Sequence, residues 1–342
     1  MIEKTTLSYL QTAIDPNIQA DHYSFSETSP HNYHLNMRYY TGVENQIIAQ
    51  GLEAQLQRLS PTQTATVSCQ QGVAPHQISN HVQGKAEMKN IIAVVSGKGG
   101  VGKSTVTTNL AVALQQLGAT VGVVDADIHG PSQPTMLGVT SSDLAARSSG
   151  LAPVAAHQIV SASIRYFMTK EDPVMWRGPM VSRALEQMIH DISWPALDYL
   201  LIDMPPGTGD IALTLAKKLP VTAALVVTTP QQVACIDAAK AAKMCVNMHV
   251  PMLGIVENMA TYHCPHCQAS SALFGVGGGA KLAGELGLPM LASLPLMPAI
   301  QVGGDQGLPG VLSNREAGEA YRALAVKIGQ QLALRPLDSM RS

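Results

Sequence analysis

The stretch Gly97-Lys-Gly-Gly-Val-Gly-Lys-Ser-Thr105 decides the fold of this chain. It fits the pattern G-x-x-x-x-G-K-S/T, in which glycines let backbone N–H groups turn inward on a polyphosphate. In that pattern Lys103 is expected at the β- and γ-phosphates and the Ser104 hydroxyl on Mg²⁺. The predicted nucleotide-binding residues of this loop are Gly97, Lys98, Gly99, Gly100, Val101, Gly102, Lys103, Ser104 and Thr105.

The segments on either side of this loop predict a strand and a helix. Ile91–Ser96 is apolar and β-branched, and Thr105–Leu117 has a helical pattern. Further apolar runs of strand length follow at Thr120–Asp125, Tyr199–Asp203, Ala223–Thr228, Leu253–Glu257 and Met290–Leu294. Because strands that are apolar throughout are covered on both faces, the sequence predicts an α/β fold, a P-loop NTPase with a mostly parallel sheet between helices. Helices are expected at Val181–Ile192, Gln231–Asn247, Gly279–Leu286 and Asn314–Leu334, and an extra hairpin or edge strand within Leu151–Met168.

The residue composition and hydrophobic pattern change near residue 75. This change predicts that the chain has three parts. Residues 1–74 are expected to form a small α+β domain, with a short N-terminal helix, a helix over Glu44–Leu59, and strands near Tyr33–Tyr40 and Ala65–Cys69. Residues 75–89 contain proline, glycine, amides and mixed charges, as linkers do. Residues 90–342 are expected to form the P-loop ATPase domain.

The composition is that of a globular protein with little net charge. The 342 residues are 46% hydrophobic, which is enough for a sizeable core. The net charge of −2 gives no basic surface field for nucleic acid or anionic lipid. No apolar stretch approaches the roughly 20 residues of a membrane span, and the N-terminus has no apolar signal segment. We therefore expect a cytoplasmic protein with neither nucleic acid nor membrane as a partner.

Acidic residues end two of the expected strands. Asp203 follows four apolar residues, the Walker B arrangement that positions Mg²⁺, and Met204–Asp210 after it could act as a switch that senses the γ-phosphate. Asp125 and Asp127 end another strand. One of the two is expected to order the Mg²⁺ shell and the other to orient water; alternatively, Asp127 caps the next turn. The predicted Mg²⁺ residues are Ser104, Asp125 and Asp203.

Lys98 is a second lysine in the phosphate-binding loop. Since Lys103 and backbone N–H groups already serve the phosphates in cis, Lys98 could reach the γ-phosphate of a neighbouring subunit and stabilise transition-state charge in a dimer. The alternative is a solvated lysine on a glycine-rich loop. The first interpretation predicts a homodimer.

His263-Cys-Pro-His-Cys267 places two cysteines at metal-ligand spacing. Zinc and 4Fe–4S clusters usually take four ligands, and the chain has no second CxxC, so a two-fold axis could join two Cys264–Cys267 pairs at one metal centre. Zinc completed by His263 or His266, or a loop disulfide, is the alternative. With Cys69, Cys235 and Cys245 the chain has five cysteines, an odd number, and we expect them to be reduced. Cys235 and Cys245 are interpreted as buried side chains that fill space within a predicted helix.

Several ordered motifs carry a family resemblance. They are Ser-Gly-Lys-Gly-Gly-Val-Gly-Lys-Ser-Thr from Ser96, Asp-Ala-Asp-Ile-His-Gly-Pro-Ser from Asp125, Trp-Arg-Gly-Pro-Met from Trp176, Asp-Met-Pro-Pro-Gly-Thr-Gly-Asp from Asp203, Val-Glu-Asn-Met from Val256 and Cys-Pro-His-Cys from Cys264. From about Asn90 to Leu312 the chain resembles the Mrp/ApbC iron–sulfur carrier ATPases, in the deviant-Walker group that includes MinD, ParA and the nitrogenase iron protein.

The resemblance implies an ATP-sandwich homodimer that holds a labile 4Fe–4S cluster on paired CxxC motifs and passes it to acceptor apoproteins, with scaffold proteins as further partners. It implies that Lys98 acts in trans, that Asp127 lies near the attacking water and that Asn258 contacts adenine. The predicted catalytic residues are then Lys98, Lys103 and Asp127, the cluster ligands are Cys264 and Cys267, and the cofactors are ATP, Mg²⁺ and the cluster. The family often carries a small N-terminal domain also found in iron–sulfur assembly factors, which residues 1–74 resemble only through Asp15-Pro16.

Two other functions stay open from the sequence. A MinD/ParA-like switch would bind a partner or a surface and use the CxxC for structural zinc, but Glu316–Leu334 has few basic residues and much alanine, as a packing helix does. An electron-transfer protein of the nitrogenase type would be expected to have its cysteines far apart in the chain. Gln232 also departs from the family, whose members commonly have Asp at this helix start.

Overall fold

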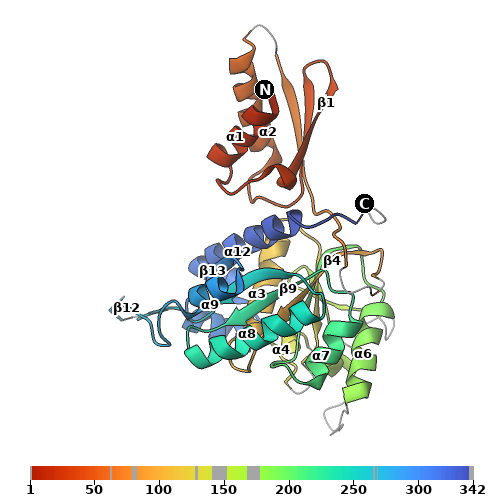
Figure 1. Ribbon diagram of the computed structural model, residues 1–342, viewed down its shortest axis with the longest axis vertical. Coiled ribbons are helices and arrows are strands. Elements are labelled where there is room, and N and C mark those ends of the chain that lie inside the picture. The colour runs from red at the N-terminus through yellow and green to blue at the C-terminus, as the bar shows by residue number, and fades with distance from the viewer. Residues whose placement is uncertain are drawn as a thin grey trace.

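A mostly parallel sheet forms the centre of the larger part of the molecule (Figure 1). The computed structural model describes residues 2–61, 64–78, 82, 84–127, 130–140, 152–167, 178–264, 266–267 and 269–338. Within these ranges the sheet has eight strands in the order β13-β10-β9-β4-β8-β5-β7-β6. The strands are β4 (Met88–Val95), β5 (Val121–Asp125), β6 (Val154–Ala156), β7 (Ile159–Ser163), β8 (Leu197–Asp203), β9 (Ala223–Thr228), β10 (Met252–Glu257) and β13 (Met290–Ser293).

Helices cover both faces of this sheet, as its apolar strands require. Along β4, Ile92 and Val94 face one core, whereas Ile91 and Val95 face the other. The first core includes side chains of α3 (Lys103–Gln116), α11 (Gly310–Ser313) and α12 (Arg315–Ala333), with α4 (Gln133–Met136) and α10 (Pro298–Asp305) beside them. The second includes side chains of α6 (Gly178–His190), α7 (Asp210–Lys218), α8 (Gln232–Asn247) and α9 (Gly278–Leu286). The predicted fold class is therefore confirmed.

Most predicted elements occur within three residues of their expected bounds. The edge hairpin expected within Leu151–Met168 is β6–β7, whose outer strand β6 pairs antiparallel while β7 pairs parallel with β5. Helices α7, α10 and α11 were not predicted, because each is short and begins beside glycine or proline rather than in a periodic apolar run. The expected packing role of the last helix is confirmed, since α12 buries residues along its whole length. Trp176 and His129 of the quoted motifs lie outside the described residues.

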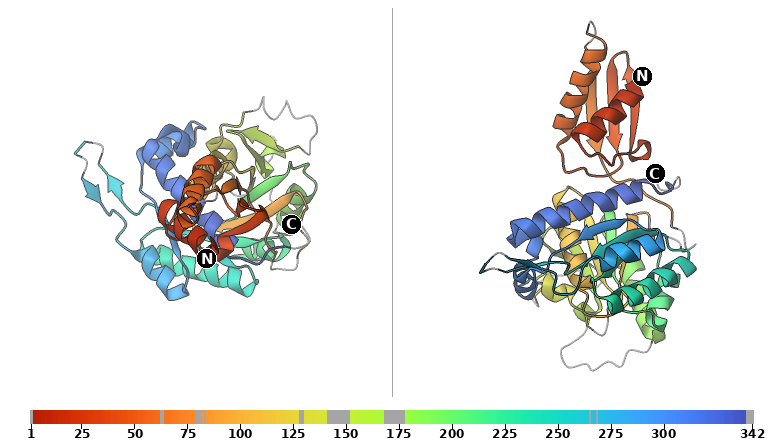
Figure 2. Two further views of the ribbon diagram at one scale, coloured as in Figure 1. Left: turned by 90° about the horizontal axis from the view of Figure 1, so that it is seen from above. Right: turned by 60° about the vertical axis from the view of Figure 1, so that its left-hand side comes forward.

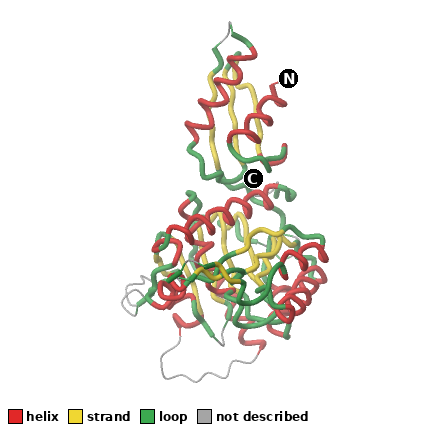
Figure 3. The backbone as a smooth tube through the Cα atoms, turned by 90° about the vertical axis from the view of Figure 1, so that its left-hand side faces the viewer, coloured by secondary structure: helices red, strands yellow, loops and turns green. Residues whose placement is uncertain are grey.

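The N-terminal part forms its own small sheet of β1 (Tyr23–Ser29), β2 (Asn32–Met37) and β3 (Thr66–Gln71). Strand β2 pairs antiparallel with β1 and parallel with β3. One sheet face is apolar and packs with α1 (Ile2–Ala13) and α2 (Asn45–Leu59), and Figure 3 shows these helices beside the strands. A short 3₁₀ turn, η1 (Ala20–His22), precedes β1. The sequence did not predict β1 because Tyr23 and Phe25 are its only apolar residues.

Helix α12 joins the two parts of the molecule. Its residue Ala333 belongs to the N-terminal core, and the Gln330 amide donates to Asp15 Oδ2 at 2.6 Å and to Tyr39 Oη at 3.3 Å. Part of the segment expected as a linker is held as well, because Gln77 N donates to the Pro336 carbonyl at 3.0 Å. The N-terminal sheet thus rests on the outer side of α12 (Figure 1).

A short hairpin projects from the larger part of the molecule (Figure 2). Its strands, β11 (Tyr262–His263) and β12 (Ser270–Ser271), pair antiparallel and enclose the segment that carries the CxxC motif. Among the described residues, none of the helices is both long and apolar enough to cross a membrane.

Candidate functional site

The loop between β4 and α3 has the backbone shape that a phosphate-binding loop needs. Gly100 and Gly102 have φ angles of +80° and +81°, which side chains with a Cβ rarely adopt. A Cβ on Gly97 would collide with the backbone of Asp237 in α8, and one on Gly102 with the amide of Asn258. Helix α3 begins at Lys103, so its free N–H groups face the loop and can bind an anion.

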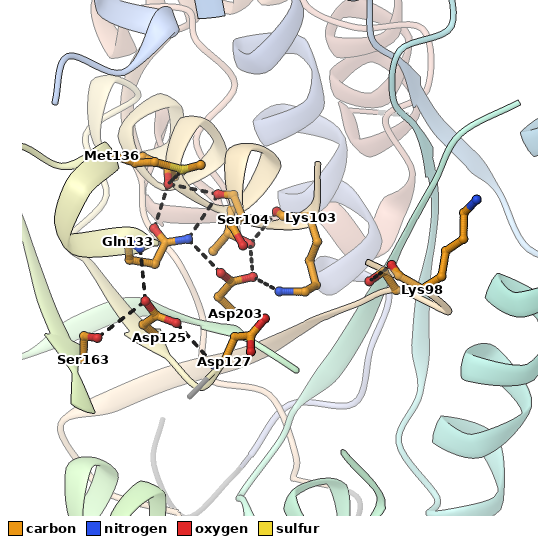
Figure 4. A network of polar contacts seen from close by, with 12 residues as sticks. Lys98, Lys103, Ser104, Asp125, Asp127, Gln133, Met136, Ser163 and Asp203 are labelled. Carbon is orange, nitrogen blue, oxygen red and sulfur yellow. Dashed lines mark hydrogen bonds and ion pairs between the residues drawn. The ribbon is translucent and has the colours of Figure 1, made fainter. Parts of the chain in front are cut away.

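Lys103 and Asp203 form a buried ion pair below this loop (Figure 4). Lys103 is 5% exposed and Asp203 is fully buried at the end of β8. The Thr107 hydroxyl lies 3.4 Å from Asp203 Oδ1. A buried carboxylate without a cation is costly, so Lys103 stabilises Asp203 while remaining at the start of α3, where phosphates bind.

Asp125 lies directly opposite Asp203, because β5 and β8 pair in register at these two residues. Its carboxylate accepts hydrogen bonds from Gln133 N at 3.1 Å and Asp127 N at 3.2 Å, and Ser163 Oγ lies 3.5 Å away. Burial, and secondly the charge of Asp203, raise the pKa of Asp125. A divalent cation would relieve this repulsion, since hard cations prefer carboxylate oxygens.

Gln133, at the start of α4, was not selected from the sequence although it lies in the middle of this network (Figure 4). It is fully buried, and its amide nitrogen donates to Asp203 Oδ2 at 2.9 Å. The signal available in the sequence was its place directly after the Asp125–Ser132 motif. A polar side chain there, followed by Pro134, fits no apolar helix face.

Lys98 points away from the buried carboxylates. In Figure 4 its side chain leaves the loop on the opposite side from Lys103, and Nζ lies 3.4 Å from Gln231 Oε1. Asp127 is half-buried beside Asp125. The structure therefore brings together Lys103, Ser104, Asp125 and Asp203, with Asp127 at their edge, and leaves Lys98 facing outward.

A cavity of about 240 Å³ lies beside the first turn of α3. Thr105, Asn258 and Met259 line one part, and the segment Pro295–Met297 lines another. The Asn258 amide donates to the Val101 carbonyl at 2.9 Å, which fixes this wall against the phosphate-binding loop. Only Thr105 and Asn258 were selected from the sequence. The segment Pro295–Met297 follows β13, whose carboxyl end meets the same edge of the sheet, and this rule could have found it.

Cys264 and Cys267 lie on the projecting hairpin, half-buried and exposed respectively. Cys264 N donates to the Ala269 carbonyl at 3.0 Å, and the backbone N–H groups of Cys267 and His266 lower the pKa of the Cys264 thiol. A stabilised thiolate suits a soft metal or an iron–sulfur cluster. Across the described ranges, no group of three or more His, Cys, Asp or Glu side chains could hold a metal ion, so this pair supplies two ligands. His263 instead lies 3.9 Å from Glu316.

The remaining cysteines lie outside this hairpin. Cys245 is buried in α8 as expected, and burial raises the pKa of its thiol to about 12. The expectation for Cys235 was wrong, since this residue is only half-buried and its thiol lies 3.4 Å from the Thr229 carbonyl at the rim of α8. Cys69 is half-buried in β3.

The family model of the NUBPL iron-transfer P-loop NTPases, of the ParA group, matches residues 87–329. This chain belongs to that family. It is 45% identical over 285 residues to the iron–sulfur cluster carrier protein of Pseudomonas fragi, covering 82% of this chain and 99% of that protein. The match places the phosphate-binding loop and the cysteine hairpin within one family domain.

Solved structures support the same family fold. A nucleotide-binding protein of Archaeoglobus fulgidus, in complex with ADP and with cobalt found, is 34% identical with a TM-score of 0.60, covering 69% of this chain and 93% of that one. The cell division ATPase MinD of Pyrococcus furiosus is 26% identical with a TM-score of 0.53, covering 70% and 98%. The larger part of the chain thus has the MinD-like P-loop NTPase fold.

Proposed function

We propose that this protein is an ATP-hydrolysing carrier that assembles a 4Fe–4S cluster between two subunits and transfers it to acceptor apoproteins. The observation that carries the proposal is the Cys264–Cys267 pair on the projecting hairpin, which offers two soft ligands in a chain of the iron-transfer family. A cluster usually takes four thiolates, so two copies of the hairpin at a two-fold axis complete the site. The cluster is cargo in this scheme, so accessible ligands favour its release.

The geometry of the loop supports the proposed nucleotide chemistry. Backbone N–H groups of the loop and Lys103 hold the phosphates, and Ser104, Asp125 and Asp203 hold Mg²⁺ directly or through water. Asp127, at the edge of the buried carboxylates, orients the attacking water. The adenine base enters the cavity beside Asn258.

Lys98 acts in the partner subunit in this proposal. Its side chain points away from the phosphate site of its own chain, and its Nζ lies 3.4 Å from Oε1 of the half-buried Gln231. A cation in that position stabilises the transition-state charge only when a second subunit closes over it. The nucleotide sandwich and the shared cluster therefore require the same homodimer.

The base cavity also contacts the root of the cysteine hairpin. Leu296 lines the cavity and donates its N–H to the Thr261 carbonyl at 2.7 Å, and Leu296 forms a parallel bridge with Tyr262 of β11. On the other side of the hairpin, Gly279 N donates to Glu257 Oε1 at 2.7 Å, one residue before Asn258. These contacts support coupling between nucleotide state and cluster transfer.

We also propose the division of the chain into an N-terminal domain of residues 1–74, a linker of residues 75–89 and an ATPase domain of residues 90–342. Asp15 belongs to the Asp-Pro pair through which residues 1–74 resemble iron–sulfur assembly domains. Its carboxylate accepts a hydrogen bond from the Gln330 amide of α12. That contact favours a docking role for the small domain over a separate catalytic one.

The alternative is a MinD-like switch in which the CxxC holds structural zinc. The likeness to MinD favours it, whereas the packing of α12 along its whole length leaves this helix no free apolar face for a surface. The two functions predict different metals and different cargo transfer.

The decisive experiment is anaerobic reconstitution of the wild type and of a Cys264→Ala/Cys267→Ala variant with iron and sulfide or with zinc. We expect about four irons per dimer in the wild type, none in the variant, and transfer to an apo-acceptor that requires the wild type. Cys245→Ala, a buried cysteine of α8, is the matched control and should keep the cluster. Uptake of zinc but not iron by the wild type, or a cluster that survives in the double variant, would contradict the carrier function.

A further inference from the structure

Gln133 makes four polar contacts with three different segments of the nucleotide site. Its backbone N–H donates to Asp125 Oδ2 at 3.1 Å. Its amide nitrogen donates to Asp203 Oδ2 at 2.9 Å and to the Ser104 carbonyl at 3.1 Å. Its amide oxygen lies 2.7 Å from the Thr108 hydroxyl. The side chain of this one buried residue therefore ties the end of β8 to the first turns of α3, and its backbone N–H adds the end of β5.

The orientation of this amide is determined by its neighbours. The two groups at its nitrogen, the Asp203 carboxylate and the Ser104 carbonyl, can only accept hydrogen bonds. The group at its oxygen is a hydroxyl, which can donate. Reversing the amide would place its oxygen against two acceptors in a fully buried site, at a large desolvation penalty.

The two oxygens of Asp203 consequently have different partners. Oδ1 pairs with Lys103 and lies near Thr107, whereas Oδ2 is held by Gln133. If Lys103 turned toward bound phosphates, Oδ1 would lose its cation and would be free to enter a metal shell. The hydrogen bond at Oδ2 does not depend on Lys103, so it can keep the carboxylate in place through that exchange.

We infer that Gln133 is a positioning residue for nucleotide hydrolysis: its amide fixes Asp203 through Oδ2 so that Oδ1 can pass from Lys103 to the Mg²⁺ shell. This inference rests on the proposed ATPase function. Gln133 touches neither phosphate nor metal in this scheme and acts through Asp203 and the Ser104 carbonyl. It lies six residues after Asp127 in the chain.

The test compares Gln133→Met with Gln330→Met in the full-length protein. Methionine is similar in length to glutamine but cannot donate, so each variant loses the amide contacts of one buried glutamine. Gln330 lies in α12, where this helix contacts Asp15 and Tyr39 of the N-terminal part of the molecule, away from the nucleotide site. The readouts are thermal stability, kcat, KM for ATP and the Mg²⁺ concentration that gives half-maximal ATPase activity.

We expect Gln133→Met to raise the half-maximal Mg²⁺ concentration or lower kcat by about 10-fold, since loss of groups that orient metal ligands typically has effects of this size. KM for ATP should change less, because the loop and Lys103 remain. Gln330→Met should lower stability and leave the Mg²⁺ dependence unchanged. A Gln133→Met protein with wild-type kcat and Mg²⁺ dependence would overturn the inference, whereas a wild type without Mg²⁺-dependent ATPase activity would overturn the proposed function as well.

A second pair of variants decides the matter if Gln133→Met does not fold. Thr108→Val removes the hydroxyl that holds the Gln133 oxygen and keeps the side-chain shape, and Thr108→Ser keeps the hydroxyl. Thr108→Val should shift the Mg²⁺ dependence in the same direction to a smaller extent, and Thr108→Ser should restore it. Equal Mg²⁺ dependence in the valine and serine variants would contradict the inference.

Discussion

The Leu296 N–H donates to the Thr261 carbonyl at 2.7 Å, and this hydrogen bond joins the cavity beside α3 to the root of the cysteine hairpin. Leu296 lines the cavity, and Thr261 directly precedes β11. A base that enters the cavity therefore contacts the segment from which the hairpin projects. Among the described residues, no hydrogen bond joins the phosphate-binding loop to the hairpin.

This relationship predicts that binding of the base, rather than of the phosphates, changes the reactivity of the cysteine pair. We expect ADP or ATP to change the alkylation rates of Cys264 and Cys267, and inorganic tripolyphosphate to leave them close to the rates of the free protein. Peptide mass spectrometry after timed iodoacetamide labelling measures each thiol, and half-buried Cys69 in the N-terminal sheet is the internal control. Equal effects of ADP and tripolyphosphate would show that the base contact does not link nucleotide binding to the cysteine hairpin.

Lys98→Ala should lower ATP turnover while leaving nucleotide affinity nearly unchanged, because the side chain points away from its own phosphate site. Loss of one group that stabilises transition-state charge typically costs about 100-fold in kcat. Steady-state turnover and the affinity for a fluorescent ATP analogue measure the two effects. Lys240→Ala, which removes an exposed lysine of α8 paired with Asp237, is the control. Wild-type turnover in Lys98→Ala would remove Lys98 from catalysis.

The stability of the protein should fall below pH 6.5 through His22. Burial lowers the pKa of this histidine, against the opposing charges of Asp15 and Asp21 and with Arg38 acting in the same direction as burial. Below the ordinary value of 6.5 the unfolded chain binds a proton more readily than the folded one, so stability present above pH 6.5 is lost as the pH falls.

His22→Gln should therefore give a shallower dependence of the unfolding free energy on pH between about 7.5 and 5.5. The slope due to one histidine is at most about 1.4 kcal/mol per pH unit. Urea unfolding at several pH values measures it, and His190→Gln, at an exposed position in α6, is the control. The prediction is wrong if the His22 variant keeps the wild-type slope.

Gly329→Ala should destabilise the contact between α12 and the N-terminal sheet. A Cβ at this position would lie 2.8 Å from Tyr39 Cβ, which cannot swing away as a long side chain could. We expect a loss of about 1–3 kcal/mol, as overpacking of a core produces. Gly284→Ala in α9 meets nothing within 4 Å and should instead raise stability by up to about 1 kcal/mol. Urea unfolding compares the two variants, and a gain in stability for Gly329→Ala would contradict the packing argument.

Local patterns in the sequence were sufficient for much of the large sheet. The six apolar runs from Ile91 to Leu294 became strands because burial on both faces leaves continuous apolar sequence. Strand β1 was missed since its outer face is polar, and α7 was missed because it is short and follows a glycine-rich turn. The phosphate-binding loop was found because its glycines are required by local backbone angles and by close packing.

Other parts of the site depend on contacts between residues far apart in the chain. Gln133 meets Asp203 seventy positions away, and Thr261 meets Leu296 across the cysteine hairpin. No local pattern encodes such pairs, because they arise only when strand order brings the carboxyl ends of β5, β8, β10 and β13 to one edge. The sequence by itself determined the phosphate-binding loop, the parallel sheet and the two-cysteine motif, since each follows from spacing and periodicity. Only the tertiary structure decided which carboxylates share one buried network, where the cavity beside α3 lies and which direction Lys98 takes, because these depend on packing between distant segments.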